Sequence, residues 1–305
     1  MRIYYTDHFD LPLPDGHRFP MEKYRRLRQR VVSSEDHKDD TLIVPPAATD
    51  QQLLLCHSAR YVHAVTSGTL TDAEIRRIGF PWSLPMVERS RRSTGATIAA
   101  CRAAITDGIA VNLAGGTHHA MTDAGEGYCV FNDAAVAIRS LQREGLIRRA
   151  CVIDLDVHQG NGTAQILADD STTFTLSIHG VRNFPLRKTP SDLDVALEDG
   201  TGDETYLQTL DKSLRSVAQS GPFDLAIYVA GADPFADDRL GRLALTKDGL
   251  EDRDRRVIKW CQDHGIPLAI AMGGGYARQV SDIVDIHVST VRMASKNRLS
   301  LQLSL

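Results

Sequence analysis

Beyond residue 108, short apolar runs alternate with longer segments in which apolar residues recur every three or four positions. The runs are rich in β-branched residues and have the length of buried strands, at 109–113, 150–153, 172–178, 223–229 and 267–272. The longer segments predict helices at 132–144, 163–168, 203–219 and 246–264. The chain therefore alternates strands with helices over most of its length.

Strand–helix alternation predicts a single α/β domain over residues 1–305, with a central parallel β-sheet and helices on both faces. A strand that is buried on both faces has a continuous apolar sequence, as in 225–229. Three further elements extend the pattern, a strand at 2–5, a long helix at about 85–107 and a closing helix at 276–294.

The N-terminal hundred residues have a weaker pattern, and we expect them to pack onto the same domain. Thr49 to Gln52 and Thr71 to Glu74 are capping-box sequences, which predict the starts of two short helices. The polar stretch 33–40 predicts a solvated loop.

The composition is that of a globular protein, and it excludes several classes of function. The chain has 35 lysines and arginines against 39 aspartates and glutamates, so its net charge of −4 argues against direct binding of nucleic acid. No stretch approaches about 18 consecutive apolar residues, so we expect no membrane span. The five cysteines are scattered and form no C-x-x-C pair, which is typical of reduced thiols in a cytoplasmic protein.

Side chains suited to metal or acid–base chemistry follow directly after four of the predicted strands. The carboxyl ends of parallel strands lie at one edge of a sheet, where open α/β sheets bind their ligands. We therefore expect one shared site at that edge, with side chains from His118, His119, Asp154, Asp156, His158, Asp233 and Tyr276.

Two carboxylates and one imidazole of this set suit a metal ion. Asp156 and His158 are two residues apart, which places both on the same side where a strand passes into a loop. With Asp233 they make three protein ligands, the number typical of a catalytic zinc site, although Fe²⁺ or Co²⁺ would also fit. Taken alone, D-x-H is more often a capping or core arrangement, but its setting in DLDVHQGNGT (154–163) favours a metal site.

The neighbouring His118 and His119 can face one site only in a turn, which the glycines at 115–116 allow. Paired histidines can act as general base and general acid near neutral pH, and Asp154 and Asn161 are candidates to orient them. The alternative is a pair of structural histidines in a loop.

Tyr276 follows three glycines, and its phenol is suited to donate a hydrogen bond to a developing oxyanion. The alternative is a tyrosine that packs at the start of a helix. The convergence of four strand ends favours the catalytic interpretation.

Five motifs occur in a fixed order, GTHHA (116–120), GYCVFND (127–133), DLDVHQGNGT (154–163), AGADxxxxDxLG (230–241) and GGGY (273–276). Together they resemble the zinc-dependent histone deacetylases. That family includes bacterial acetoin-utilisation proteins and acetylpolyamine amidohydrolases and has the arginase/deacetylase α/β fold. The HQGN form and DGTGDETY (199–206) are most similar to the class IV branch.

The resemblance implies roles for most of these residues. It implies a zinc ion with the ligands Asp156, His158 and Asp233. It also implies that His118 and His119 form a tandem acid/base pair, with His119 as the base, and that Tyr276 polarises the scissile carbonyl.

The resemblance also implies two binding regions around the catalytic residues. The acyl-lysine tunnel would be formed by Gly127, Tyr128, Phe184, Leu240 and Gly274. A monovalent-cation site, usually potassium, would use Asp154, the Ser177 hydroxyl and backbone oxygens of Asp156, His158 and Ile178.

Three positions bear on how closely the chain follows the family. Asn161 stands where some relatives have aspartate, so the partner of His119 is neutral here. Tyr128 replaces the commoner phenylalanine, which makes the tunnel slightly more polar. Leu240 stands where polyamine-preferring relatives tend to have an acidic residue, which argues against a polycationic substrate.

We therefore predict a metal-dependent amidohydrolase that removes an acyl group from the ε-nitrogen of lysine and releases a carboxylate and free lysine. The expected partner is an acylated lysine peptide. A small acetylated amine or polyamine is the first alternative substrate, and a catalytically silent module that binds acyl-lysine is the second alternative. A silent module would lack a metal ligand or the tyrosine, and none of them is missing.

Overall fold

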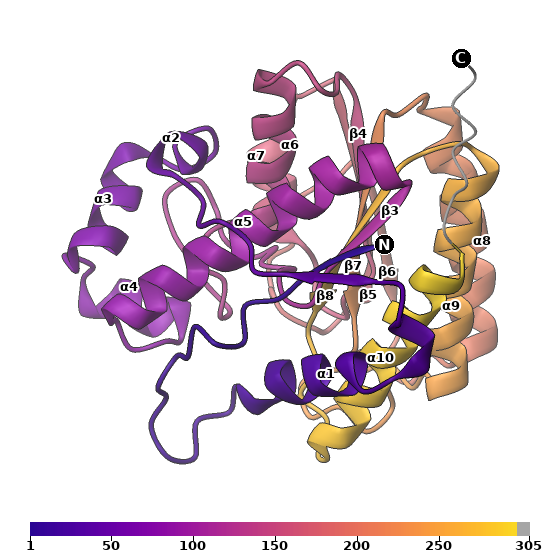
Figure 1. The fold of residues 1–305 in the computed structure, drawn as a ribbon, viewed down its shortest axis with the longest axis horizontal. Helices are drawn as coiled ribbons and strands as arrows, with labels where there is room; N and C mark the ends of the chain where they lie inside the picture. The colour runs from indigo at the N-terminus through magenta and orange to yellow at the C-terminus, as the bar shows by residue number, and fades with distance from the viewer. Residues whose placement is uncertain (298–305) are drawn as a thin grey trace.

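The structure, a computed structural model, describes residues 1–297 and contains one sheet of eight parallel strands (Figure 1). The strand order is β2-β1-β3-β8-β7-β4-β5-β6. The strands are β1 (Arg2–Tyr4), β2 (Thr41–Ile43), β3 (Ile109–Asn112), β4 (Ala150–Asp154), β5 (Thr173–Gly180), β6 (Leu193–Leu197), β7 (Leu225–Gly231) and β8 (Leu268–Gly273). The predicted class, one α/β domain with a parallel sheet, is confirmed.

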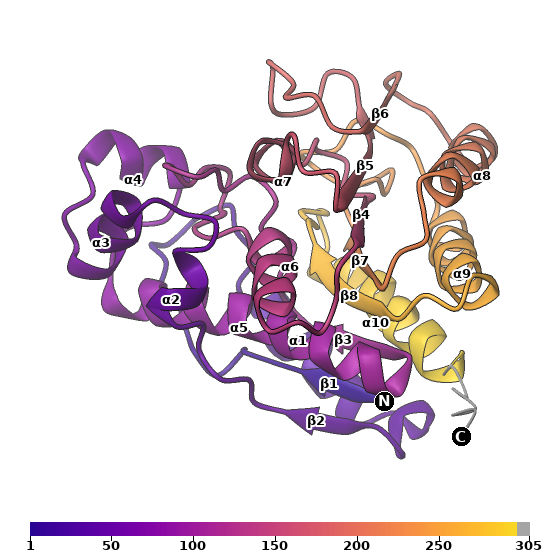
Figure 2. The ribbon, with the colours of Figure 1, turned by 90° about the horizontal axis from the view of Figure 1, so that it is seen from above.

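Helices cover both faces of this sheet, as Figure 2 shows for α5 and α6 on one side and α8 and α9 on the other. Helix α1 packs against α10, while α2, α3 and α4 form an outlying group beyond α5. The helices are α1 (Glu22–Val32), α2 (Asp50–Leu53), α3 (Ala59–Ser67), α4 (Asp72–Ile78), α5 (Leu84–Asp107), α6 (Asp133–Arg143), α7 (Asn161–Leu167), α8 (Asp203–Gln219), α9 (Lys247–Asp263) and α10 (Val280–Lys296). None of the helices within residues 1–297 is long and apolar enough to cross a membrane.

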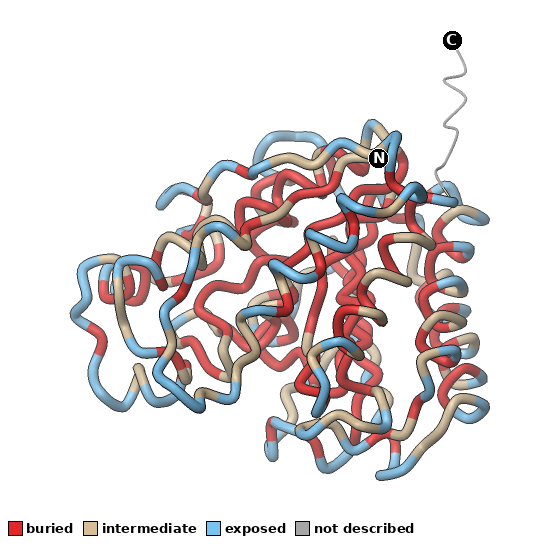
Figure 3. The backbone as a smooth tube through the Cα atoms, turned by 60° about the horizontal axis from the view of Figure 1, so that its bottom comes forward, coloured by how far each residue is buried: buried red, intermediate tan, exposed pale blue. Residues whose placement is uncertain are grey.

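The sheet separates two hydrophobic cores, and its strands contribute alternate side chains to each. In β3, Ile109 and Val111 belong to the core shared with α8, α9 and α10, whereas Ala110 belongs to the core shared with α5 and α6. Figure 3 shows the buried backbone concentrated in the sheet and in the helix faces that turn toward it. Because both faces are covered, the central strands are apolar throughout, and this is why their sequences have continuous apolar runs.

Local signals in the sequence set several helix ends. Thr49 and Thr71 each close the predicted capping box, with reciprocal hydrogen bonds to Gln52 and Glu74. Helix α5 begins after the N-cap Ser83 and ends at a glycine, close to the predicted bounds. The five cysteines are free and buried.

The structure differs from the sequence prediction at a few elements. Strands β2 and β6 were not predicted, because edge strands of three and five residues show too little periodicity. The stretch 33–40 is mostly exposed but contains a short 3₁₀ helix (Glu35–His37), in which His37 is buried against Asp40.

The last helix starts at Val280 instead of 276. Tyr276 stays in a loop because the Asp238 carboxylate accepts its backbone N–H, and the backbone and side chain of Arg239 donate to its carbonyl oxygen.

Candidate metal and catalytic site

The four strands that carry the predicted site residues are neighbours in the sheet, in the order β3-β8-β7-β4. Their carboxyl ends therefore lie side by side, and the loops that follow them meet over one pocket. Six of the predicted side chains line it, namely His118, His119, Asp156, His158, Asp233 and Tyr276. The topology thus brings together the catalytic and metal-ligating candidates that are far apart in the sequence.

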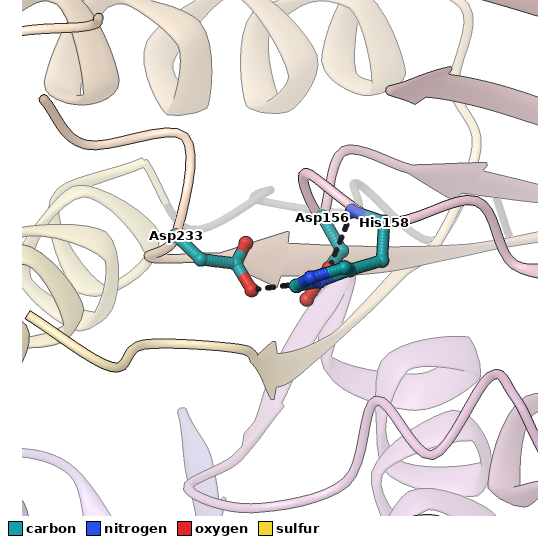
Figure 4. Close-up of side chains that lie close together, drawn as sticks. All are labelled: Asp156, His158 and Asp233. Carbon is teal, nitrogen blue, oxygen red and sulfur yellow. Dashed lines mark hydrogen bonds and ion pairs between the residues drawn. The ribbon is translucent and has the colours of Figure 1, made fainter. Parts of the chain in front are cut away.

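Asp156, His158 and Asp233 all line this pocket, and their side chains point toward one another (Figure 4). One ligand atom of each lies within 4.8 Å of those of the other two. His158 Nδ1 is 2.9 Å from Asp156 Oδ1 and 3.3 Å from Asp233 Oδ2. Backbone contacts hold this arrangement, since the Val157 N–H donates to Asp233 Oδ1 at 2.9 Å.

The donor set fits a divalent cation. Asp233 Oδ2 is buried and accepts no hydrogen bond from any residue in 1–297. A buried carboxylate oxygen without a hydrogen bond needs a nearby cation, which is the imidazolium of His158 when that residue is protonated and would be the metal ion when one is bound. Gly274 leaves room at this oxygen, because a Cβ atom there would lie 2.0 Å from it.

Protons compete with a metal ion for these ligands. Burial disfavours the imidazolium of His158, but Asp156 and Asp233 outweigh burial and raise the pKa of His158 to about 10. Burial and the charge of Asp156 also raise the pKa of Asp233. Because only the deprotonated groups bind a cation, metal binding must release protons.

The affinity for Zn²⁺ should therefore rise with pH. Below about pH 10 His158 is protonated, and displacing one proton makes the apparent affinity increase by up to about tenfold per pH unit. Titration calorimetry in two buffers with different ionisation enthalpies, between about pH 6 and pH 8, would count the released protons. An affinity that is independent of pH would contradict the displacement of a proton from His158 by the metal ion.

The two histidines lie with their ring centroids 4.1 Å apart but in opposite electrostatic surroundings. His118 Nδ1 is 2.6 Å from Asp154 Oδ2. Burial opposes the charged form, yet Asp154 and Asp156 raise the pKa of His118 to about 9. For His119, burial and the neighbouring His118 and His158 hold the pKa well below its usual range. Near neutral pH His119 is therefore the neutral member of the pair.

A chain of hydrogen bonds behind His119 fixes which nitrogen carries its proton. His119 Nδ1 is 2.7 Å from Asn161 Oδ1, and Asn161 Nδ2 donates to Glu126 Oε1 at 2.6 Å. The Glu126 carboxylate, which also pairs with Arg77 at 2.8 Å, can only accept, so it turns the amide oxygen of Asn161 toward His119. His119 Nδ1 is thus the donor, and Nε2 is left as the basic nitrogen.

Glu126 supplies a negative charge behind a neutral partner. The partner of His119 is the amide of Asn161, and the carboxylate of Glu126 lies one hydrogen bond further away. Glu126 was not predicted as a site residue, although it directly precedes the GYCVFND motif.

Replacing Glu126 by glutamine should lower kcat roughly 10–100-fold, the usual effect of losing an outer partner of a catalytic histidine. A glutamine can donate as well as accept, so it no longer fixes the orientation of Asn161. Steady-state kinetics on an acetyl-lysine peptide would measure the change. Arg77→Gln is the matched control and should have a smaller effect, because Arg77 is half-exposed and touches neither Asn161 nor His119. Equal effects of the two variants would contradict this role of Glu126.

Tyr276 is buried in the wall of the pocket that His118 and His119 also line. Burial raises the pKa of Tyr276 well above its usual range, so the phenol keeps its proton and stays a hydrogen-bond donor. Lys23 Nζ lies 5.3 Å from the Tyr276 ring centroid and donates to the carbonyl oxygens of Gly274 and Gly275. Lys23 thus fixes the backbone just before Tyr276, and Asp238 and Arg239 fix the backbone of Tyr276 itself.

Three of the five predicted substrate residues, Gly127, Tyr128 and Gly274, line this pocket. Gly127 has a left-handed φ of +57° and lies against His119, since a Cβ atom there would be 2.7 Å from its ring. The Tyr128 ring is 6.0 Å from the Tyr276 ring, and the half-exposed Phe184 ring packs at right angles to His119 at 4.9 Å. Leu240 lies apart from this lining, in an adjoining hollow at the mouth.

Two side chains of the predicted potassium site, those of Asp154 and Ser177, form hydrogen bonds within the protein. Asp154 and Ser177 are register partners at neighbouring positions on β4 and β5. Asp154 uses Oδ2 for His118 and Oδ1 for the backbone N–H of Asp156, and Ser177 Oγ is 3.0 Å from His179 Nδ1. A potassium ion bound by Asp154, Ser177 and nearby backbone oxygens stays a prediction.

A buried arginine contacts the backbone next to the metal-ligand candidates. Arg253 of α9 donates from Nη1 to the carbonyl oxygens of Gly231, at 2.6 Å, and Leu155, at 3.3 Å. Leu155 directly precedes Asp156, and Gly231 lies two residues before Asp233. The charge of Arg253 is paired with Asp254, which also accepts from the Tyr228 hydroxyl. The pair ties the two strand ends to one helix.

Comparison with known proteins agrees with this site. A family model described as the histone deacetylase domain matches residues 17–291. The chain belongs to the histone deacetylase family. It is 43% identical over 285 residues to an uncharacterized protein of Picosynechococcus sp., covering 93% of this chain and 95% of that protein. It is 30% identical over 300 residues to histone deacetylase 2 of Arabidopsis thaliana, covering 93% of this chain and 77% of that protein.

Solved structures in the same family have the same fold. A histone deacetylase homologue from Aquifex aeolicus superposes with a TM-score of 0.80 at 22% identity, over 98% of this chain and 84% of that one. The predicted family and fold are thus confirmed, and the chain is placed among deacetylase-like amidohydrolases.

Besides Glu126, several groups that hold the loops of this histone deacetylase-family site were missed by the sequence analysis. Asp133 accepts from the backbone N–H groups of Gly116 and Thr117 and so shapes the turn before His118. Asp238 does the same for the loop of Tyr276. Both aspartates belong to quoted motifs, which was the available signal, whereas no motif contained Lys23.

Proposed function

We propose that this chain hydrolyses the amide bond of Nε-acyl-lysine with a divalent cation, most simply Zn²⁺, held by Asp156, His158 and Asp233. The observation that carries the proposal is the buried Asp233 Oδ2, which accepts no hydrogen bond within residues 1–297 and lies 3.3 Å from His158 Nδ1. It lies in the pocket that also holds His119 and Tyr276.

A bound divalent cation supplies Lewis acidity, which polarises a carbonyl oxygen and lowers the pKa of water. The side chains of His119 and Tyr276 move the proton and stabilise the developing charge. His119 Nε2 accepts a proton from the attacking water, since Asn161 and Glu126 keep the proton of the ring on Nδ1. The phenol of Tyr276 donates a hydrogen bond to the carbonyl oxygen as its negative charge develops.

Collapse of the adduct breaks the C–N bond and requires a proton on the leaving nitrogen. The histidine pair supplies it, and lysine leaves as the free amine while the acyl group leaves as a carboxylate. His118, held in its charged form by Asp154, keeps a positive charge beside His119 while that residue is neutral. This favours the return of the proton from His119 to the leaving nitrogen.

The pocket wall fits the alkyl chain of lysine. Tyr128 and Phe184 offer aromatic faces at the rim, and a methylene chain packs well between such rings. The absence of a side chain at Gly127 lets its backbone lie close to the His119 ring, where the substrate amide would also lie, because a Cβ atom at this position would be 2.7 Å from that ring.

The test is a parallel assay of an acetyl-lysine peptide, peptides with longer acyl chains, and acetylputrescine. We expect turnover of an acyl-lysine peptide that is lost after chelation and restored by Zn²⁺, with about one metal ion per chain by elemental analysis. Preferential hydrolysis of acetylputrescine would replace the proposal by a small-amine deacetylase. Binding of acyl-lysine peptides without turnover of any substrate, by the metal-loaded protein, would indicate a silent binding module.

A further inference from the structure

We propose that the mouth of the pocket selects acyl-lysine substrates that carry a carboxylate close to the acylated lysine, an inference that rests on the proposed function. Its basis is a hollow lined by Arg18, Arg239, Leu240 and Tyr276. Tyr276 also lines the main pocket, and both arginines are exposed, so the hollow adjoins that pocket on its solvent side.

Arg18 is carried to this place by a segment that runs along the tunnel wall. Its neighbours His17 and Phe19 both contact the Tyr128 ring, at centroid distances of 5.8 and 5.3 Å. Arg18 itself is exposed and forms no hydrogen bond or ion pair with any residue of the described chain. Its guanidinium is therefore free to bind a ligand at the mouth.

Arg239 reaches the same hollow from the loop after β7. Its Nε donates to the carbonyl oxygen of Tyr276 at 2.9 Å, which anchors the side chain beside the pocket. The rest of the guanidinium has no carboxylate partner within residues 1–297. The two carboxylates that precede it in the sequence are already engaged, Asp237 with Arg278 at 3.5 Å and Asp238 with three backbone N–H groups.

Two guanidinium groups without acidic partners form a site for a carboxylate. The planar guanidinium of an arginine can donate two parallel hydrogen bonds to the two oxygens of a carboxylate. A carboxylate on the substrate could therefore bind to the guanidinium groups of both arginines. The same pair repels a polyamine, which agrees with the apolar Leu240 at this position. The net charge of the chain is −4, so any attraction of a carboxylate comes from these two arginines and not from the overall charge.

The first experiment compares the unmodified metal-loaded enzyme on end-blocked acyl-lysine peptides that differ only in having Glu, Gln or Lys beside the acylated residue. At low ionic strength we expect KM roughly 3–10-fold lower for Glu than for Gln, and highest for Lys. The Glu preference should shrink as salt is added. A second comparison uses acyl-lysine with either a free or an amidated α-carboxylate. A lower KM for the free form would show that the arginines bind the α-carboxylate of the acylated lysine itself, and not only a neighbouring side-chain carboxylate.

The second experiment reverses one charge. Arg18→Glu should abolish or invert the preference for Glu over Gln. Arg215→Glu is the matched control, because Arg215 is an exposed arginine near the end of α8, far from the carboxyl edge of the sheet, and it changes the net charge equally.

Equal KM values for Glu and Gln peptides, or equal shifts from the two variants, would overturn the inference while peptide hydrolysis leaves the proposed function standing. If none of the peptides is hydrolysed, the proposed function fails first.

Discussion

Replacing Tyr276 by phenylalanine should lower kcat about 10²–10³-fold while leaving the metal content unchanged. The phenol keeps its proton, because burial raises its pKa, and it lies in the wall of the pocket that the two histidines also line. Loss of its hydrogen bond removes stabilisation that develops only as the carbonyl oxygen gains charge, so KM should change little.

Single-turnover kinetics with elemental analysis of the same sample would test this expectation. Tyr128→Phe is the matched control, since it removes a phenol from the same pocket at a ring distance of 6.0 Å, and it should lower kcat less than about tenfold. Loss of metal in the Tyr276 variant, or equal losses of kcat in the two variants, would contradict the role assigned to Tyr276.

Replacing Asp233 by asparagine should weaken metal binding by at least about 10²–10³-fold and abolish turnover. An apparent zinc-binding free energy of about 10–16 kcal/mol is shared among a few ligands, so each contributes several powers of ten. The amide can still accept from the Val157 N–H, which keeps the loop in place.

The same substitution should remove most of the stabilisation that Zn²⁺ gives the folded protein. A cation that binds only the folded state raises Tm, and the rise depends on the affinity to which Asp233 contributes. Thermal denaturation should therefore show a rise in Tm, from EDTA to a fixed Zn²⁺ concentration, that is large for the unmodified chain and small for Asp233→Asn. Asp263→Asn, on the surface of α9, is the control for the change of charge. An unchanged metal affinity would remove Asp233 from the ligand set.

The parts of this molecule that could be predicted from sequence are those fixed by local pattern or by parallel topology. The central strands are buried on both faces, so their apolar runs are unambiguous, and Asp156 and Asp233 follow two of them directly. Because parallel strands end at one edge, the sequence was enough to predict that these residues meet.

The parts that could not be predicted depend on contacts between distant segments. Asn161 and Glu126 are 35 residues apart, and Lys23 and Gly275 are 252 residues apart, and no periodicity links them. The edge strand β6 is short and half exposed, so its sequence differs little from that of a loop. These groups hold the site in place, which explains why the catalytic residues were predictable and their supports were not.

One divalent ion, shared by three side chains from two loops, is central to the proposed chemistry. Anomalous diffraction at the zinc edge, from crystals of the protein prepared with Zn²⁺, would locate that ion directly. We predict a single strong peak between Asp156, His158 and Asp233. The absence of a peak there, or a peak only at some other position, would contradict the central claim.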